Sequence, residues 1–169
     1  ASTPTELAEG RFRSVIDDQE ARQRASSVRR LLLCSGKVYV DLVSSEQRQS
    51  SSHVAICRVE QLAPFPRVAL REVLDSYPAL QEVVWLQEEP ENMGAWDWVR
   101  GQLEETIEER FTLRYIGRVR SASPSEGSAA WHQINQRKLV DEAFALESRG
   151  IVGSTVLSKA VRSLATSKR

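Results

Sequence analysis

The sequence predicts a three-layer α/β domain, in which helices cover both faces of a mostly parallel sheet of about five strands. Two observations lead to this fold class. Short apolar segments without polar alternation recur along the chain, which is typical of strands covered on both faces. Between them lie longer segments whose apolar residues repeat at helical spacing. Because strands that alternate with helices are joined by right-handed crossovers, the sheet is expected to be mostly parallel.

Four segments are predicted as strands, and each is short and mainly apolar. They comprise residues 28–35, 53–60, 82–87 and 111–117. The second is followed by "APFP", whose prolines cannot donate hydrogen bonds to a neighbouring strand. This order of strands along the chain leaves room for a helix after each of them.

The segments after the strands are predicted as helices, with a polar loop, "SASPSEGS", before the last one. They comprise residues 36–49, 67–77, 94–110 and 129–146. Pro78 directly follows the second helix and ends it. The third helix has an acidic outer face, and the fourth is predicted to be strongly amphipathic.

Composition and charge limit the classes of function. The chain has 169 residues, of which 41% are hydrophobic and 27% charged, as expected for one globular domain. Lys plus Arg and Asp plus Glu number 23 each, so no overall attraction to nucleic acid is expected. No apolar segment approaches the roughly 18 residues of a membrane span. The chain begins "ASTPTELAEG", without a signal peptide or initiator Met, and is expected to be a piece of a longer protein.

Few residues point to catalysis. Cys34 and Cys57 each lie inside an apolar segment and are interpreted as buried thiols of a reducing compartment. The chain has neither metal-ligand spacing nor a nucleophile or phosphate-loop motif, so no catalytic, metal or cofactor residue is assigned. The only histidines, His53 and His132, pair with no visible nucleophile. Glutamates in "LQEEPEN" follow a strand, at the edge where α/β sites gather, but acidic loops are common.

The helix after "QEEPEN" carries Trp96 and Trp98. Residues two apart diverge by about 200° around a helix, so both indoles are not expected to face one core. One of them is predicted to contact a neighbouring domain or subunit. The alternative is that a bent helix start or the local loop buries both.

The last residues, 147–169, form a basic tail. Five cations follow Ala145 against one anion, Glu147, and apolar residues recur every four positions from Val152 to Leu164. This pattern predicts a weak basic amphipathic helix. The tail either is an appendage of its own domain or binds an acidic surface elsewhere.

The sequence "CSGK" follows the first predicted strand. Ser35 offers a cap-like hydroxyl, Gly36 allows close approach of the backbone, and Lys37 adds a positive charge. The amides at the start of a helix are unpaired, so a phosphate or carboxylate is suited to this position. Either a plain helix cap or a small anion site is compatible with these residues.

Five motifs together resemble the C-terminal domain of 2-oxoglutarate dehydrogenase, the thiamine-diphosphate-dependent decarboxylating component of its complex. They occur in the order of that family between Phe12 and Phe144: "CSGKVYVDL", "VAICRVEQLAPFP", "VVWLQEEPENMGAW", "RYIGRVRSASPSEG" and "WHQINQRKLVDEAF". The resemblance implies a fold like the C-terminal domain of transketolase. Residues 28–146 would form this domain, and residues 1–27 would be a linker or extended lead-in from a preceding catalytic domain.

The resemblance also implies a role in assembly rather than in chemistry. The parent enzyme decarboxylates 2-oxoglutarate and transfers succinyl to lipoamide in the tricarboxylic acid cycle. Its thiamine diphosphate and Mg²⁺ are held by domains that this sequence lacks, since the chain has no Gly-Asp-Gly loop. The implied partners are a second copy of the parent, the lipoyl-bearing succinyltransferase and dihydrolipoamide dehydrogenase. The implied compartment is the bacterial cytoplasm or the mitochondrial matrix.

Some members of the family bind an acyl-coenzyme A effector on this domain, which favours the anion site. The matching residues would be Ser35, Lys37, Gln87 and Arg118, at the ends of three strands. Effector-sensitive members tend to carry two adjacent arginines, whereas this chain reads "GRVR". Two alternatives stay open: a free-standing regulatory or scaffolding domain without a catalytic parent, and the equivalent domain of a 2-oxoadipate dehydrogenase.

Overall fold

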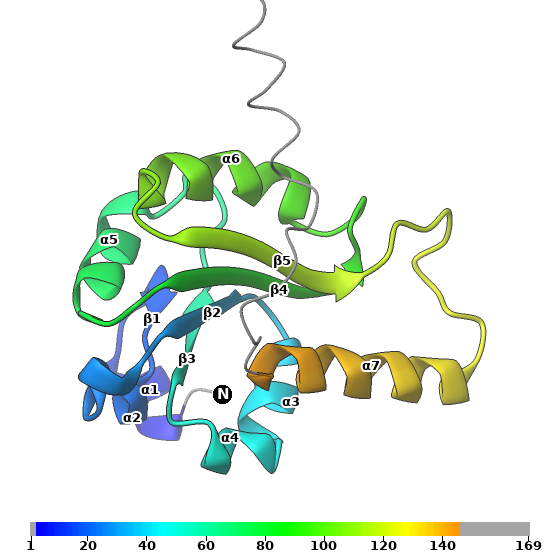
Figure 1. The fold of residues 1–169 in the computed structure, drawn as a ribbon, viewed down its shortest axis with the longest axis horizontal. Helices are drawn as coiled ribbons and strands as arrows, with labels where there is room; N and C mark the ends of the chain where they lie inside the picture. Colours follow the sequence, from blue (N-terminus) through cyan, green and yellow to red (C-terminus); the bar gives the residue numbers. More distant parts are fainter. Residues whose placement is uncertain (1–2, 146–169) are drawn as a thin grey trace, which may run out of the picture.

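A five-stranded sheet forms the centre of the computed structural model, which describes residues 3–145 (Figure 1). Its strands lie in the order β1-β3-β2-β4-β5. β1 pairs antiparallel with β3, and the other pairs are parallel. The strands are β1 Val15–Ile16, β2 Arg30–Cys34, β3 Val54–Val59, β4 Glu82–Pro90 and β5 Thr112–Arg118. The predicted α/β class with a mostly parallel sheet is therefore confirmed.

β2, the central strand, shows why the apolar segments do not alternate with polar residues. All five of its residues are buried. Leu31 and Leu33 belong to the core on one face of the sheet, and Leu32 and Cys34 to the core on the other. Successive side chains of a strand point to opposite faces, so a strand with two covered faces is apolar along its length, as Leu31 to Cys34 are; the buried Arg30 at its start is paired with Glu82.

Helices cover both faces of the sheet. Residues of α2, α5 and α6 join one core, and residues of α3 and α7 join the other. Figure 1 shows α5 and α6 on one side of the sheet and α3, α4 and α7 on the opposite side. The bounds are α2 Gln19–Arg22, α3 Val38–Ser44, α4 Gln47–Ser50, α5 Arg67–Asp75, α6 Trp96–Ile107 and α7 Ala129–Phe144; a 3₁₀ turn spans Ala25–Ser27.

The helix predicted over residues 36–49 is two short helices, α3 and α4. Ser45 separates them in an extended conformation, with φ −71° and ψ 138°. Its hydroxyl accepts a hydrogen bond from the backbone N–H of Gln47 at 3.3 Å. Serine side chains compete in this way with the helical backbone pattern, which explains the break.

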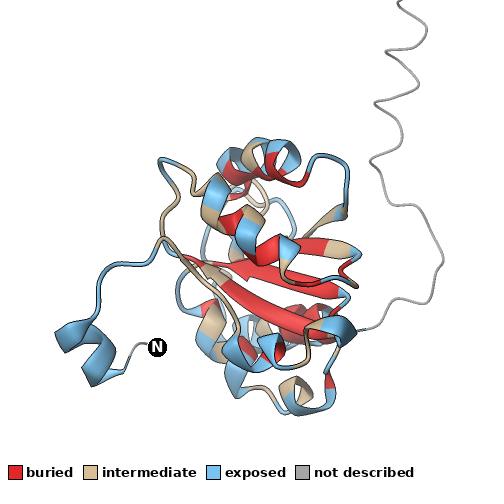
Figure 2. Ribbon diagram, turned by 90° about the vertical axis from the view of Figure 1, so that its left-hand side faces the viewer, coloured by how far each residue is buried: buried red, intermediate tan, exposed pale blue. Residues whose placement is uncertain are grey.

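The lead-in predicted over residues 1–27 contributes to the domain itself. Its second half supplies β1, α2 and the buried Ala21. The carboxylate of Asp18 accepts hydrogen bonds from the amides of Ala21 and Ile56 at 3.0 Å and pairs with Arg48 at 2.6 Å. By contrast, α1 Pro4–Glu9 buries no residue and stands apart from the rest of the domain (Figure 2). The folded domain thus begins well before residue 28.

The parallel strands end at one common edge, here called the carboxyl edge of the sheet. β4 reaches Pro90, three residues beyond its predicted end, with an irregular register against β5 after Leu86. The basic tail, residues 147–169, lies outside the described residues. Within residues 3–145, no helix has the length and apolar character needed to cross a membrane.

Candidate functional site

The turn of Ser35, Gly36 and Lys37 lies at the carboxyl edge, between β2 and α3. Gly36 has φ +76°, a left-handed conformation that glycine adopts without strain. The predicted capping role of Ser35 is wrong: α3 starts after Lys37 and has no side-chain cap hydrogen bond. With the chain in the left-handed conformation at Gly36, the N-cap position falls on Lys37, two residues after Ser35.

Lys37 is held by two carboxylates. Its Nζ lies 2.7 Å from Oδ2 of Asp41 and 3.8 Å from Oε1 of Glu88. The pKa of Lys37 is raised, first by the hydrogen bond to Asp41 and also by the charge of Glu88. The side chain is 67% exposed, so the cation is charged and accessible from solvent.

Gln87 is buried and organises the loop that follows β4. Its Oε1 accepts hydrogen bonds from Nε1 of Trp85 at 2.9 Å and from the backbone N–H of Trp96 at 3.1 Å. Its Nε2 donates to the backbone carbonyls of Met93 at 2.7 Å and Pro90 at 3.2 Å. Both ends of the amide are therefore committed within the protein, and Gln87 positions the loop.

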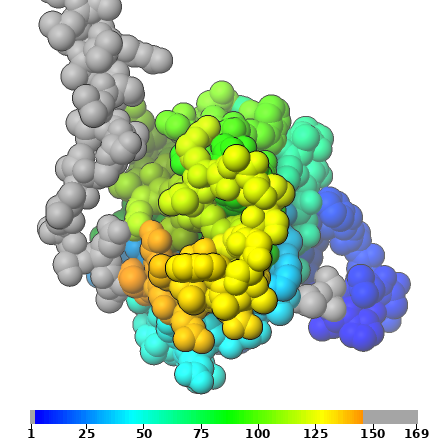
Figure 3. Space-filling view, turned by 90° about the vertical axis from the view of Figure 1, so that its right-hand side faces the viewer, coloured from blue at the N-terminus to red at the C-terminus, as the bar shows by residue number. Residues whose placement is uncertain are grey.

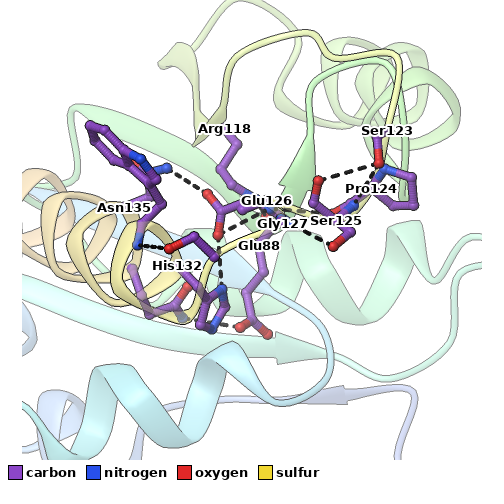
Figure 4. Close-up of polar contacts among 12 residues, drawn as sticks. Glu88, Arg118, Ser123, Pro124, Ser125, Glu126, Gly127, His132 and Asn135 are labelled. Carbon is purple, nitrogen blue, oxygen red and sulfur yellow. Dashed lines mark hydrogen bonds and ion pairs between the residues drawn. The ribbon is translucent and has the colours of Figure 1, made fainter.

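Arg118 ends β5 and reaches the same part of the edge as Lys37. Its Nε donates to the backbone carbonyl of Glu88, whose carboxylate contacts Lys37. Its Nη1 lies 3.4 Å from the carbonyl oxygen of Pro124 and 3.4 Å from Oε2 of Glu126 (Figure 4). Lys37 and Arg118 thus contact different groups of the same residue, the carboxylate and the backbone carbonyl of Glu88.

Sequence reasoning missed the polar residues that complete this cluster. Glu126 contacts Nδ1 of His132 at 2.9 Å and accepts a hydrogen bond from Asn135 at 2.5 Å (Figure 4). Gln136 donates to Asp41 at 2.7 Å and to Glu88 at 3.0 Å. The spacing of Asn135 and Gln136 on α7 does not indicate which residues they contact, since their partners lie on other segments.

A groove with a volume of about 550 Å³ adjoins Arg118, between the end of β5, the loop of residues 119–128 and α7. Figure 3 shows the loop and α7 on this face of the molecule. Two cations, Arg118 and Lys138, and two anions, Glu126 and Glu142, line the groove, so its formal charge cancels. The exposed ring of Trp131 forms part of its wall.

The two tryptophans of α6 point in different directions, as predicted. Trp96 is buried and stacks at a tilt against Tyr115, with ring centroids 5.1 Å apart. Trp98 is 52% exposed, and its Nε1 donates to the backbone carbonyl of Leu62 at 2.8 Å. The exposed face of Trp98 stays a candidate for contact with a neighbouring domain or subunit.

The remaining polar candidates form no metal site in the described part of the chain. Within residues 3–145, no group of three or more His, Cys, Asp or Glu side chains could hold a metal ion. Burial, followed by the charge of Arg30, lowers the pKa of His53. Of the glutamates in "QEEPEN", Glu88 contacts Lys37 and Gln136.

The comparison with protein families decides the relationship of the chain. The family described as 2-oxoglutarate dehydrogenase C-terminal matches residues 1–144. The chain belongs to this family. The resemblance carried by the five motifs is therefore confirmed, and the basic tail follows the matched region.

Curated members of the family agree with this assignment. The 2-oxoglutarate dehydrogenase E1 component of Cupriavidus necator is 43% identical over 141 residues, which are 83% of this chain and 15% of the relative. That of Shouchella clausii is 39% identical over 146 residues, 85% of this chain and 16% of the relative. The "multifunctional 2-oxoglutarate metabolism enzyme" of Mycobacterium sp. (strain KMS) is 41% identical over 144 residues, which are 83% of this chain and 11% of the relative. The chain thus spans about one sixth or less of the length of these relatives.

Proposed function

We propose that this domain completes the E1 component of a 2-oxoglutarate dehydrogenase. The parent would decarboxylate 2-oxoglutarate oxidatively and transfer the succinyl group to lipoamide. The observation that supports this is the family match over residues 1–144 together with E1 relatives at 39–43% identity. The domain would contribute to a homodimer and, through the parent, to a complex with the lipoyl-bearing succinyltransferase and dihydrolipoamide dehydrogenase.

Thiamine diphosphate and Mg²⁺ do not fit the residues of this domain. Mg²⁺ prefers oxygen ligands, but three carboxylates at the carboxyl edge, those of Asp41, Glu88 and Glu126, already contact cationic or imidazole side chains of the same domain. Among the described residues, no group of three or more Asp, Glu, His or Cys side chains could hold a metal ion. We therefore assign both cofactors to other domains of the parent.

The experiment compares the full-length parent enzyme with a form that ends before this domain. The intact enzyme is expected to decarboxylate 2-oxoglutarate, with 2-oxoadipate as the competing substrate, and to sediment as a dimer. The shortened form is expected to lose the dimer. A shortened form that keeps both dimer and activity would contradict the assembly role, and a preference for 2-oxoadipate would reassign the parent.

A second proposal concerns regulation: the carboxyl edge near Ser35, Lys37 and Arg118 binds an anionic effector of the acyl-coenzyme A type. Two observations favour it. Lys37 and Arg118 both contact Glu88, and the groove beside Arg118 also contains Lys138. Gln87, which the sequence analysis placed in the same site, would not contact the effector but would hold the loop after β4 in position.

Calorimetric titration with acetyl-coenzyme A tests the effector site in the wild-type chain, in Lys37→Ala and in Arg118→Ala. Saturable binding by the wild type and weaker binding by both variants are expected, because each variant removes one cation. Equal binding by all three proteins, or no saturable binding, would return the turn at Gly36 to a purely structural role.

A further inference from the structure

Glu126 and Arg118 both line the groove and pair with each other there. Its Oε2 lies 3.4 Å from Nη1 of Arg118 and 2.9 Å from Nδ1 of His132. Its Oε1 accepts a hydrogen bond from Nδ2 of Asn135 at 2.5 Å. The Glu126 side chain is only 13% exposed, although it belongs to a surface loop. Three side chains therefore bind this carboxylate in one position.

The loop around Glu126 is also fixed on both sides. After it, Gly127 has φ +67°, and Ser128 caps α7 by accepting a hydrogen bond from the N–H of Trp131. Before it, Arg118 reaches the carbonyl of Pro124, and serine hydroxyls accept hydrogen bonds from the amides of Ser123 and Ser125. This geometry directs the carboxylate toward Arg118.

Glu126 also sets the charge of the groove. With it, the four charged residues that line the groove sum to zero; without its charge, Arg118 and Lys138 face Glu142 alone, which leaves one net positive charge. The hydrogen bond from Asn135, then that from His132 and the charges of Arg118 and His132, lower the pKa of Glu126. Glu126 is therefore an anion at neutral pH.

We propose that Glu126 is an internal competitor that closes the Arg118 groove to external anions until its carboxylate is displaced. This inference deepens the effector proposal and rests on it for the acyl-coenzyme A arm of the test. A guanidinium binds one carboxylate or phosphate well, so an incoming anion must break the contact with Glu126 first. The binding free energy of the incoming ligand is reduced by the free energy needed to break that contact, so the ligand binds more weakly.

The test measures binding of inorganic pyrophosphate and, separately, of acetyl-coenzyme A to the full chain by calorimetry. Glu126→Gln keeps the size of the side chain and an oxygen that accepts from Asn135, but removes the charge. It is expected to bind pyrophosphate at least about tenfold more tightly than the wild type, within the usual range of coupling between two sites. The double variant Glu126→Gln with Arg118→Ala is expected to lose this gain.

Glu142→Gln is the matched control, since Glu142 lines the same groove but pairs with Arg114 instead of Arg118. Its pyrophosphate affinity is expected to stay within about twofold of the wild type, because only the general charge changes. An equal gain in Glu142→Gln, or no gain in Glu126→Gln, would overturn the proposal. Thermal unfolding of each variant, followed by circular dichroism, verifies that it is folded.

The two ligands separate this inference from the effector proposal. Tighter pyrophosphate binding by Glu126→Gln, with no acetyl-coenzyme A binding by the wild type or by this variant, supports the role of Glu126 as competitor and refutes the effector proposal. Equal acetyl-coenzyme A binding by the wild type and Glu126→Gln supports the effector and refutes the competitor. Absence of saturable binding of both ligands by all variants refutes both.

Discussion

Gln87 shows how one buried amide determines the shape of a loop. Substitution by Ala would leave the N–H groups of Trp85 and Trp96 and the carbonyl of Met93 without their partner. The carbonyl of Pro90 would keep its hydrogen bond from the backbone N–H of Met93. Because buried polar groups without partners cost about 1–3 kcal/mol each before relaxation, we expect Gln87→Ala to lower the free energy of unfolding by about 2–4 kcal/mol.

Urea unfolding measures this loss, with Gln61→Ala as the control. Gln61 also bonds a backbone carbonyl, that of Pro64, but at the surface. Its substitution is expected to change the free energy of unfolding by no more than about 0.5 kcal/mol. Equal effects of the two substitutions would show that Gln87 does not organise the loop.

The two thiols give a prediction about chemical reactivity. Burial raises the pKa of Cys34 to about 12 and raises that of Cys57 as well. Since a thiol must lose its proton to react, and a raised pKa keeps it protonated at pH 8, neither should react with a thiol reagent in the native state. Both should react once the chain is unfolded in guanidinium. Rapid reaction of one thiol in the native protein would contradict the burial seen here.

At the scale of the element, Arg30 ties the end of α7 to the sheet. It is buried, and its Nη1 donates to the backbone carbonyls of Glu142, Ala143 and Ala145 at 2.8–3.2 Å. Its Nε pairs with Glu82 at 2.5 Å. A cation at the last carbonyls of a helix satisfies groups that have no partner within the helix.

Arg30→Met is therefore expected to lower the free energy of unfolding by about 3 kcal/mol, since it leaves Glu82 and the helix carbonyls with fewer partners. Hydrogen exchange of the α7 amides should accelerate more than that of β2 and β3. Arg110→Met, which removes an exposed pair with Asp75, serves as control with an expected loss below about 1 kcal/mol. Unchanged exchange in α7 would refute the role of Arg30.

α6 supplies the candidate contact between subunits. Trp98→Ala is expected to leave the stability of the isolated chain within about 1 kcal/mol, because the ring is half exposed. In the full-length parent it should weaken the dimer at least about tenfold, as expected for an aromatic interface anchor. Sedimentation over a range of concentrations measures this, with the exposed Trp131→Ala as control. An unchanged dimer would exclude Trp98 from the interface.

At the scale of the whole molecule, the isolated chain is expected to bind neither thiamine diphosphate nor Mg²⁺ and to show no decarboxylation. The physical reason is that Glu88, Glu126 and Asp41 at the carboxyl edge already pair with cations or amides of the same domain. Calorimetric titration with cofactor and Mg²⁺ measures this, with the full-length parent as positive control. Micromolar binding by the chain alone would be incompatible with the assignment of the cofactors to other domains.

The sequence by itself determined the fold class, the parallel strands and the family, because each rests on local information. The apolar segment of residues 28–35 predicts a strand with two covered faces. The side chains of Trp96 and Trp98, which are two positions apart on a helix, must point in different directions. β1 escaped prediction because two residues carry no periodic signal.

Only the tertiary structure decided what each residue at the carboxyl edge contacts. The contact of Glu88 with Lys37 and the hydrogen bonds from Gln136 to Asp41 and Glu88 join segments that meet only after folding. Spacing along the chain places a side chain on an element, but its partners depend on how loops return to the sheet. The turn at Gly36 places the N-cap of α3 at Lys37 instead of Ser35, and Asp41 pairs with the Lys37 ammonium.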